Sequence, residues 1–312
     1  MPSFRTLTST LKATSSHHNV LLLRLGARRK SITFRNGCKA KITWPQFVIL
    51  RDCYGAIQRC SFEQVDEDLF RIGNGESKVC CTSGMIPTMC DLLQKYHIEQ
   101  VSGDEYRIKK DDMELVGSSD MLNCVREQED GEYVCECSGK VILDVGGFQG
   151  ESAVFFSKIG AKKVIIYEPV SSHHKYIKEN VSLNSVHAEI HEEGIGEKDA
   201  VLTVKCVETN AGFGLFEGNL GVKIKVRNVE EVIEKSGADI AKIDCEGAEK
   251  CLADVPSPTL RKIGFYMIET HSSVVERQLR EKFEASGFRL VKENKKAPTV
   301  LVMFFERQTP VL

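Results

Sequence analysis

Residues 141–150 read VILDVGGFQG, and this stretch decides the fold class of the second half of the chain. The run VILDV is almost wholly apolar, as expected for a strand that is buried on both faces of a sheet. Glycines follow at once, and residues 152–159 then predict a helix. A buried strand, a glycine-rich turn and a helix in this order predict the first unit of a parallel sheet that binds a ligand at the carboxyl ends of its strands.

Alternating strands and helices continue along the rest of the chain. A second helix is expected at 172–183. The further apolar strands are 164–167, 188–192, 240–243 and 264–268. Buried strands joined by helices indicate an α/β fold with a doubly wound, Rossmann-like parallel sheet. Two closing strands, 288–292 and 299–305, flank a polar turn at 294–296.

Residues 1–125 are expected to form one smaller α/β domain. It begins with strands at 20–25 and 31–42, the second of which is bent into a hairpin by the Asn-Gly pair at 36–37, because both turn residues tolerate positive φ. A helix with one buried stripe is expected to begin at Pro45. The apolar side chains of this stripe are Phe47, Leu50, Tyr54 and Ile57.

An internal repeat follows that helix. Residues 63–72 read EQVDEDLFRI and residues 99–108, 36 positions later, read EQVSGDEYRI. Each copy predicts a helix followed by two short strands, and because such a unit cannot bury its apolar face alone, the copies are expected to stack. The change of pattern after the repeat predicts a linker at 126–139 and a second domain at 140–312.

The composition is that of an ordinary soluble globular protein, with 42% hydrophobic and 28% charged residues. The longest apolar runs are far shorter than the about 18 residues that cross a bilayer, and residues 1–20 lack the apolar core of a secretory signal. Twelve cysteines are too few for a disulfide framework and lack the paired spacing of a structural zinc site. We therefore expect no membrane span and a reducing, cytoplasmic setting.

The net charge of -2 is unevenly distributed, since residues 1–51 contain ten Lys or Arg and no Asp or Glu. Such a stretch could be an arm that binds a polyanion or a membrane surface, or a transit peptide. Strand periodicity in this stretch instead favours a solvated basic face of a folded element. Any binding of nucleic acid is then expected to be weak and without sequence preference.

The carboxyl ends of the first two parallel strands are the expected site of a nucleoside. Glycines let the backbone turn sharply and approach a ligand, while the next helix points its N-terminus at the same place. Glu168 ends the second strand 22 residues after Gly146, which is the spacing of an acid that binds ribose hydroxyls. The alternative is a packing turn with a surface acid. The predicted cofactor-binding residues are Asp144, Gly146, Gly147, Gly150, Glu168 and, after the third strand, Glu193.

The residues of the turn favour one nucleoside cofactor over another. A dinucleotide motif requires glycines at two positions where this chain has Phe148 and Glu151. The Asp144 carboxylate would repel a pyrophosphate, but it would stabilise a cofactor that carries an ammonium and a sulfonium group. S-adenosylmethionine has both groups and no phosphate, so it is the expected cofactor in place of NAD.

Four motifs look like successive motifs of the FkbM family of S-adenosylmethionine-dependent methyltransferases. They are DVGG at 144–147, YEP at 167–169, KIDCEGAE at 242–249 and IETH at 268–271. The resemblance covers residues 141–291. It implies a seven-stranded sheet whose last strand is antiparallel, and methyl transfer to a hydroxyl oxygen of a sugar or natural product. The chain departs from the family pattern at Gly147-Phe148, where Ala-Asn is frequent, and at Cys245, where Val is usual.

A second group of candidate residues follows the fourth and fifth parallel strands. Asp244 and Glu246 come after the fourth strand, and Glu269 and His271 come after the fifth, so all four are expected at adjacent carboxyl ends. These are the predicted catalytic residues, because a hydroxyl must lose its proton as its oxygen attacks a methyl carbon. His271 or a carboxylate could take that proton, or the group could hold a divalent cation that lowers the pKa of the hydroxyl.

Direct proton transfer is the favoured alternative, because no second His or Asn completes a set of metal ligands at these strand ends. In that arrangement Glu269 and His271 face the acceptor and Asp244 supports them. A structural alternative for Glu246 and Glu249 is that they accept hydrogen bonds from backbone amides at a helix start.

The expected reaction is O-methylation of a small molecule or a glycan. The alternatives are methylation of nucleic acid or protein, motivated by the basic stretch near the N-terminus, and a non-catalytic nucleotide-binding module. The pair His173-His174 is expected to be solvated. Residues 197–228 are expected to form either a flap over the strand ends or a plain surface hairpin.

Overall fold

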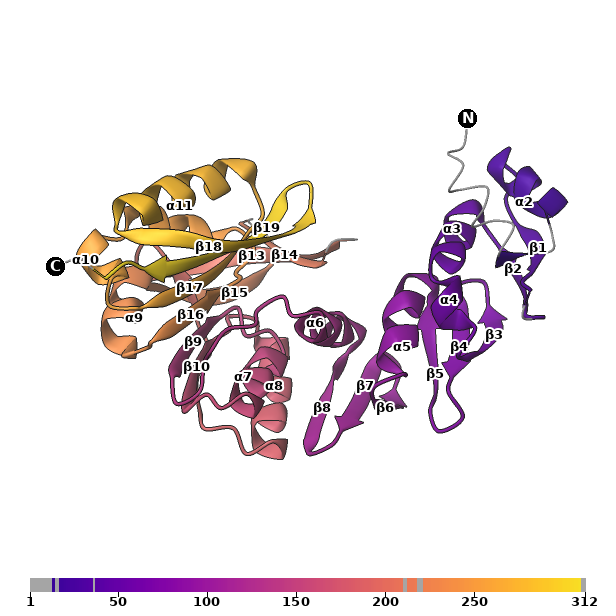
Figure 1. Cartoon of the computed structure of the whole chain (residues 1–312), viewed down its shortest axis with the longest axis horizontal. Helices are drawn as coiled ribbons and strands as arrows, with labels where there is room; N and C mark the ends of the chain where they lie inside the picture. Colours follow the sequence, from indigo (N-terminus) through magenta and orange to yellow (C-terminus); the bar gives the residue numbers. More distant parts are fainter. Residues whose placement is uncertain (1–12, 15–16, 36, 210–211, 218–220, 310–312) are drawn as a thin grey trace. The chain divides into compact units, whose positions relative to one another are not determined.

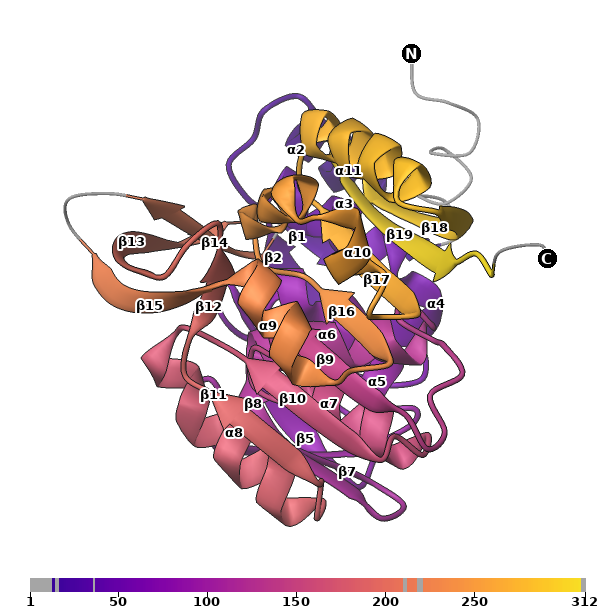
Figure 2. The same ribbon diagram turned by 90° about the vertical axis from the view of Figure 1, so that its left-hand side faces the viewer.

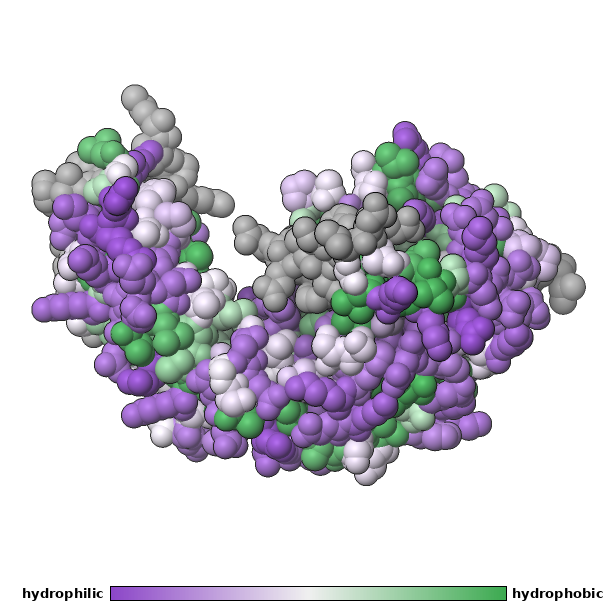
Figure 3. All heavy atoms as spheres, turned by 180° about the vertical axis from the view of Figure 1, so that it is seen from behind, coloured by the Kyte–Doolittle hydropathy of each residue, from purple (hydrophilic) through white to green (hydrophobic). Residues whose placement is uncertain are grey.

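The computed structural model describes residues 13–14, 17–35, 37–209, 212–217 and 221–309. The chain folds into two compact units, Met1–Arg126 and Glu127–Leu312, which are described separately. Within the described ranges, no helix is both long and apolar enough to cross a membrane. Figure 3 shows hydrophilic residues over most of the face that it presents, with hydrophobic residues in smaller separate patches.

The first unit begins with a helix and a hairpin. Helix α2 (His17–Arg24) buries Val20 and Leu23. Strands β1 (Lys30–Thr33) and β2 (Lys39–Ile42) pair antiparallel, which confirms the hairpin, although one turn residue at position 36 lies outside the described residues. The strand expected at 20–25 is wrong, because a short apolar run by itself does not distinguish a strand from a helix.

A capped helix follows the hairpin. Helix α3 (Trp44–Asp52) begins after Thr43, whose side chain takes part in a capping box. Phe47 and Leu50 are fully buried, as the expected stripe requires. The single helix that was expected is divided, since Tyr54–Ile57 forms a separate short helix, α4.

The internal repeat is a pair of three-stranded antiparallel sheets (Figure 1). The first sheet contains β3 (Ser61–Asp66), β4 (Leu69–Gly73) and β5 (Lys78–Thr82); the second contains β6 (His97–Ser102), β7 (Glu105–Lys110) and β8 (Met113–Ser118). The short helices η1 (Ser83–Met85) and α5 (Ile86–Leu92) lie between them in the chain. Both copies carry a β-bulge at matching positions, after Gln64 and after Gln100. Each copy therefore has one strand more than expected.

Helix α6 (Ser119–Glu129) leads from the repeat into the second unit. Beyond it, Tyr133 and Cys137 are buried, and the thiol of Cys137 contacts the carbonyl oxygen of Phe156 at 3.6 Å. The linker expected at 126–139 is therefore wrong in character, because this segment packs onto the unit that it precedes. A polar, acidic composition does not prevent a few apolar side chains from being buried.

The second unit is built on a seven-stranded sheet (Figures 1 and 2). In chain order its strands are β9 (Val141–Val145), β10 (Lys163–Tyr167), β11 (Ala188–His191), β16 (Ile240–Ile243), β17 (Phe265–Thr270), β18 (Phe288–Ala297) and β19 (Val300–Arg307). Their order across the sheet is β11-β10-β9-β16-β17-β19-β18. The first five are parallel, and β19 is antiparallel to both of its neighbours. The expected doubly wound sheet is confirmed, and the last strand in the chain, β19, is antiparallel as expected, although it lies between β17 and the edge strand β18.

Helices cover both faces of this sheet. On one side are α7 (Glu151–Lys158) and α8 (Ser171–Leu183); on the other are α9 (Val229–Ser236), α10 (Ser257–Leu260) and α11 (Ser273–Ala285), with the 3-10 helix η2 (Ala248–Asp254) before α10 (Figure 1). Leu143, Ile243 and Ile268 from the strands pack in one core with Leu279 and Phe283 of α11. Strand order reverses between β9 and β16, which is the point where sheets of this kind bind ligands.

Two segments of this unit differ from their expected form. Residues 294–296, expected in a turn, belong to β18, an edge strand whose exposed side tolerates consecutive polar residues. Most of 197–228 lies in a second sheet of four strands, at the left of Figure 2. These strands are β12 (Gly194–Gly196), β13 (Ala200–Thr209), β14 (Gly212–Glu217) and β15 (Val222–Asn228), in the order β12-β15-β13-β14.

Candidate active site

The glycine turn after β9 lies directly against its neighbouring strands. Gly146 has a φ of 77°, and a Cβ atom there would lie 1.7 Å from the carbonyl oxygen of Asp244 at the end of β16. A Cβ atom on Gly147 would lie 2.3 Å from the side chain of Ile166 in β10. Glycine is therefore required at both positions. The turn is thereby brought to the switch point between the two halves of the sheet.

Asp144 is held inside the protein rather than presented to a ligand. Its side chain is fully buried, and Oδ2 accepts a hydrogen bond of 2.5 Å from the Ser152 hydroxyl. Oδ1 lies 3.3 Å from Nζ of Lys242, which also donates to the carbonyl oxygen of Gly146 at 2.8 Å. Burial lowers the pKa of Lys242, but Asp144 and Asp244 outweigh burial and raise that pKa above its ordinary value.

This pairing corrects the electrostatic argument for the cofactor. The expectation was that a free Asp144 carboxylate would repel a pyrophosphate, yet the Lys242 ammonium balances its charge. What still disfavours a dinucleotide is the non-glycine residues Phe148 and Glu151 in the turn. Glu151 is buried, and burial raises the pKa of its carboxyl to about 8.

Glu168, at the end of β10, is oriented by backbone amides. Its Oε2 accepts from the amide of Phe148 at 3.0 Å, and its Oε1 accepts from the amide of Val170 at 2.8 Å. His173 Nδ1 lies 3.2 Å from the same Oε1, and His174 Nε2 lies 2.8 Å from the carbonyl oxygen of Glu168. Both histidines are buried, so the expectation that they are solvated is wrong. They face the strand end because both lie in the first turn of α8.

The other two predicted cofactor residues have different surroundings. Gly150 caps α7 with a φ of 87°, and a Cβ atom there would lie 3.1 Å from Cα of Ile177 in α8. Glu193, between β11 and β12, accepts a hydrogen bond of 2.7 Å from Arg227 of β15. Glu193 and Arg227 also line a cavity of about 430 Å³, together with Pro169, which follows Glu168. Asp144, Gly146, Gly147 and Glu168 thus gather around one turn, while Glu193 belongs to the junction with the second sheet.

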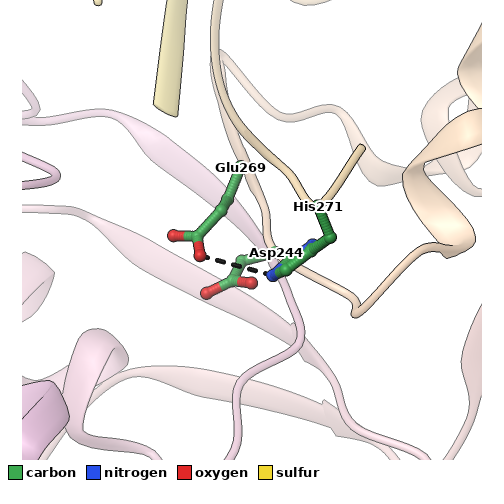
Figure 4. A group of neighbouring side chains, drawn as sticks. All are labelled: Asp244, Glu269 and His271. Carbon is green, nitrogen blue, oxygen red and sulfur yellow. Dashed lines mark ion pairs between the residues drawn. The ribbon is translucent and has the colours of Figure 1, made fainter. Parts of the chain in front are cut away.

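The four predicted catalytic residues meet at the ends of β16 and β17, and Figure 4 shows three of them, Asp244, Glu269 and His271. Nε2 of His271 lies 3.3 Å from Oε1 of Glu269 and 3.6 Å from Oε2 of Glu246. Nδ1 of His271 lies 3.4 Å from Oε1 of Glu249. Glu249 is fully buried and also accepts from the Gly247 amide at 2.7 Å, so it fills the structural role considered for it. Asp244 lies beside Glu269 in the same group.

Two residues of this group were absent from the sequence-based set. The Tyr133 hydroxyl donates to Oε2 of Glu269 at 2.5 Å and lies 3.2 Å from Oδ2 of Asp244. Nζ of Lys296, in β18, lies 3.0 Å from the same Oε2 of Glu269. Tyr133 was assigned to a linker and Lys296 to a turn, and no motif marked either. Only the packing of distant segments brings them here.

Burial and these partners move the pKa values of the group in opposite directions. Burial, followed by repulsion from Glu269, raises the pKa of Asp244 to about 6. Burial also acts to raise the pKa of Glu269, but hydrogen bonding to His271 and the charge of Lys296 prevail and lower it to about 2. Burial would lower the pKa of His271, yet Glu249 and Glu269 raise it to about 11. The imidazole is therefore charged at neutral pH.

Asp244, Glu269 and His271 offer one ligand atom each within 4.8 Å of one another, a set that could surround a metal ion. Oxygen ligands suit hard ions such as magnesium. Oε1 of Glu269 is paired with His271 and Oε2 with Lys296, however, so a cation at either oxygen would lie beside a positive charge. Lys296 and the imidazolium already supply positive charge to this group, and we assign no ion to it.

No family model and no curated protein matches this chain. Among solved structures it is similar to a fibrillarin pre-rRNA processing protein of Methanococcus jannaschii, with 13% identity, a TM-score of 0.42 and coverage of 80% of this chain and 97% of that one. An NADB-Rossmann superfamily protein of Streptococcus agalactiae has 18% identity and a TM-score of 0.38, with coverage of 60% and 69%. A Streptococcus pneumoniae protein described as a candidate tRNA methyltransferase, in complex with S-adenosyl-L-methionine, has 15% identity and a TM-score of 0.39, with coverage of 60% and 74%.

The fold class follows from the sheet itself. A seven-stranded sheet with the order found here, five parallel strands and an antiparallel strand inserted before the last edge strand, is a doubly wound, Rossmann-like sheet. The site described above lies at the carboxyl ends of its parallel strands. That is the edge where open α/β sheets bind their ligands.

Proposed function

We propose that this chain is an S-adenosylmethionine-dependent methyltransferase of the FkbM type, which methylates a hydroxyl oxygen of a small molecule or a glycan. The observation that carries the proposal is the arrangement of acids along one sheet edge. Glu168 stands at the end of β10, the glycine turn at the switch point, and Asp244 and Glu269 at the ends of β16 and β17. The KIDCEGAE motif supports the family assignment, since it runs from β16 directly into this group.

Glu168 is suited to bind the ribose of the cofactor. Two backbone amides orient its carboxylate. Oε1 has two neighbours, the Val170 amide and Nδ1 of His173, whereas Oε2 accepts from the Phe148 amide and keeps a lone pair for a further donor such as a ribose hydroxyl. Gly146 and Gly147 let the turn lie directly against Asp244 and Ile166 at the same strand ends. When bound, S-adenosylmethionine supplies an electrophilic methyl group. Asp144 supports the turn through Ser152 and Lys242 and is not assigned a contact with the cofactor.

Asp244 is the group that we assign to accept the proton of the acceptor hydroxyl. Its side chain is 24% exposed, whereas that of Glu269 is 5% exposed. As the new O–CH₃ bond forms, the O–H bond breaks and the proton passes to an oxygen of Asp244. A pKa of about 6 leaves Asp244 ionised at neutral pH and still basic enough to take a proton. The geometry thus favours a reversal of the expected roles, with Glu269 and His271 supporting Asp244.

Binding measurements test the cofactor half of the proposal. Isothermal titration should give clear binding of S-adenosylhomocysteine and much weaker binding of NAD. Glu189→Gln, which alters an exposed acid in β11, serves as a control that should bind like the wild type. Tighter binding of NAD than of S-adenosylhomocysteine would contradict the proposal.

An acceptor screen tests the reaction. Tritiated S-adenosylmethionine is incubated with glycans, small hydroxyl compounds, lipids and RNA, and the label is followed into each fraction. We expect label in the glycan or small-molecule fraction, in a linkage that resists the base treatment that hydrolyses methyl esters. Label confined to RNA would instead support the alternative of a nucleic-acid methyltransferase.

A further inference from the structure

We infer that Tyr133 and Lys296 are positioning residues of the proposed reaction, which hold Glu269 out of proton transfer and leave Asp244 to face the acceptor. The inference rests on the proposed function and deepens it. It assigns roles to two segments, 127–133 and β18, that lie outside every motif recognised in the sequence. It is carried by the contacts of one carboxylate, Glu269.

Both oxygens of Glu269 are occupied. Oε2 accepts the short hydrogen bond of 2.5 Å from Tyr133 and lies 3.0 Å from Nζ of Lys296. Oε1 lies 3.3 Å from Nε2 of His271. Only 5% of the Glu269 side chain is exposed. An acceptor hydroxyl could reach either oxygen only by entering this buried space beside a charged partner.

Asp244 has weaker partners and more open surroundings. Its Oδ2 lies 3.2 Å from the Tyr133 hydroxyl and 3.8 Å from Nζ of Lys242. A phenol has a single proton, and the shorter contact shows that Tyr133 directs it mainly at Glu269. The hydroxyl therefore stands between two carboxylates and separates them. Of the two, Asp244 is the one with an oxygen available to an acceptor.

Tyr133 and Lys296 are themselves held in place by one network. Nζ of Lys296 lies 3.2 Å from Oε1 of Glu127 and 3.1 Å from Oε2 of Glu132. Asn294, two residues earlier in β18, donates from its side chain to the carbonyl oxygen of Glu132 at 3.2 Å. Lys296 thus ties the segment that carries Tyr133 to the same strand that reaches Glu269. A residue fixed from both sides can hold a carboxylate in one orientation.

The test compares Tyr133→Phe with Tyr266→Phe. Each change removes one buried phenol hydroxyl. Tyr266 lies three residues before Glu269 in β17, and its hydroxyl donates to the carbonyl oxygen of Leu260, outside the group around Glu269. For Tyr133→Phe we expect kcat to fall tenfold to a hundredfold with the KM for S-adenosylmethionine unchanged. The rising limb of the kcat profile should move to higher pH, because Asp244 then faces Glu269 without the hydroxyl between them. Tyr266→Phe should keep both kcat and the profile.

Lys296 is tested in the same assay. Lys296→Met should lower kcat and move the profile in the same direction, because it removes a positive charge near Asp244, and Lys296→Arg should restore most of the activity. Wild-type kcat and an unmoved pH profile in Tyr133→Phe and Lys296→Met would overturn the positioning role while leaving the proposed function intact. A wild type that binds no S-adenosylhomocysteine and transfers no methyl group would overturn both.

Discussion

Glu168 and Glu269 stand at the same edge of one sheet, at the ends of β10 and β17, but different kinds of group hold them. Glu168 accepts hydrogen bonds from the backbone amides of Phe148 and Val170, and Nδ1 of His173 lies 3.2 Å from its Oε1, so these partners all lie within 20 residues of it in the sequence. Glu269 is held by side chains that are charged or phenolic, among them Tyr133, which is 136 residues away. Glu168 is therefore oriented by residues near it in the sequence, whereas Glu269 is oriented only when Tyr133, His271 and Lys296, from three separate parts of the chain, pack together.

This difference suits the two halves to different tasks. A backbone amide cannot change charge, so Oε2 of Glu168, which accepts from the Phe148 amide, is a fixed acceptor for a neutral hydroxyl such as that of a ribose. Side chains that titrate shift the pKa values of their neighbours, so the other half can adjust the basicity of a carboxylate. We therefore assign cofactor binding to the half around Glu168 and proton transfer to the half around Asp244 and Glu269.

The largest expected effect is the loss of the proton acceptor. Asp244→Asn should lower kcat by about 10²- to 10⁴-fold, the range for removal of a general base, with S-adenosylhomocysteine affinity changed by no more than a few-fold. Steady-state kinetics and isothermal titration measure the two quantities. Glu306→Gln, at the opposite end of the sheet where Glu306 pairs with Arg289, is the control. If Asp244→Asn lost kcat and S-adenosylhomocysteine affinity to the same extent, the assignment of proton transfer and cofactor binding to separate residues would be contradicted.

Removal of the Glu168 carboxylate tests the part of the site that is assigned to cofactor binding. Glu168→Ala should weaken S-adenosylhomocysteine binding by about 1–3 kcal/mol, the cost of leaving buried hydrogen-bonding groups unpaired. Because Glu168 also orients the turn amide of Phe148, thermal unfolding is measured beside the titration. A variant that unfolds normally and binds as well as the wild type would remove Glu168 from the cofactor site.

The charged residues around His271 should also make the stability of the folded protein depend on pH. The pKa of His271 is raised from 6.5 to about 11 in the folded protein, so its stabilising effect is complete below pH 6.5. As pH rises from there toward 11, the unfolded chain loses the proton first and the stabilisation is lost. Between pH 7 and pH 10, the Tm of the wild type should therefore fall by several degrees more than that of His271→Gln. Parallel curves for the two proteins would argue against a charged imidazole in the group.

The smallest effect is expected at Glu193, which the sequence placed in the cofactor site. Its carboxylate is paired with Arg227 of the second sheet, outside the turn that gathers the other candidates. Glu193→Ala should change S-adenosylhomocysteine affinity less than about threefold, well below the 1.4 kcal/mol that a tenfold change represents. A tenfold loss in the same titration would extend the cofactor site to the cavity beside Glu193.

Expectations that depend on neighbouring residues in the sequence were correct more often than expectations that depend on tertiary packing. The strand, turn and helix around 141–159 were correct, because burial period and glycine spacing are properties of adjacent residues. The strand at 20–25 and the solvated His173-His174 pair were wrong, because each depends on what the segment packs against. The polar run 294–296 resembles a turn in composition, but it lies in an edge strand.

By itself, then, the sequence determined the class of sheet and the acids at its strand ends, because residues that follow parallel strands must emerge at one common edge. Tertiary structure alone decided how those acids are charged. Lys242 neutralises Asp144 because the register of β9 and β16 sets these residues opposite each other. Tyr133 and Lys296 reach Glu269 because two remote segments pack against β17. Electrostatic interactions act over a few ångströms of space whatever the separation along the chain, so no local pattern could reveal these partners.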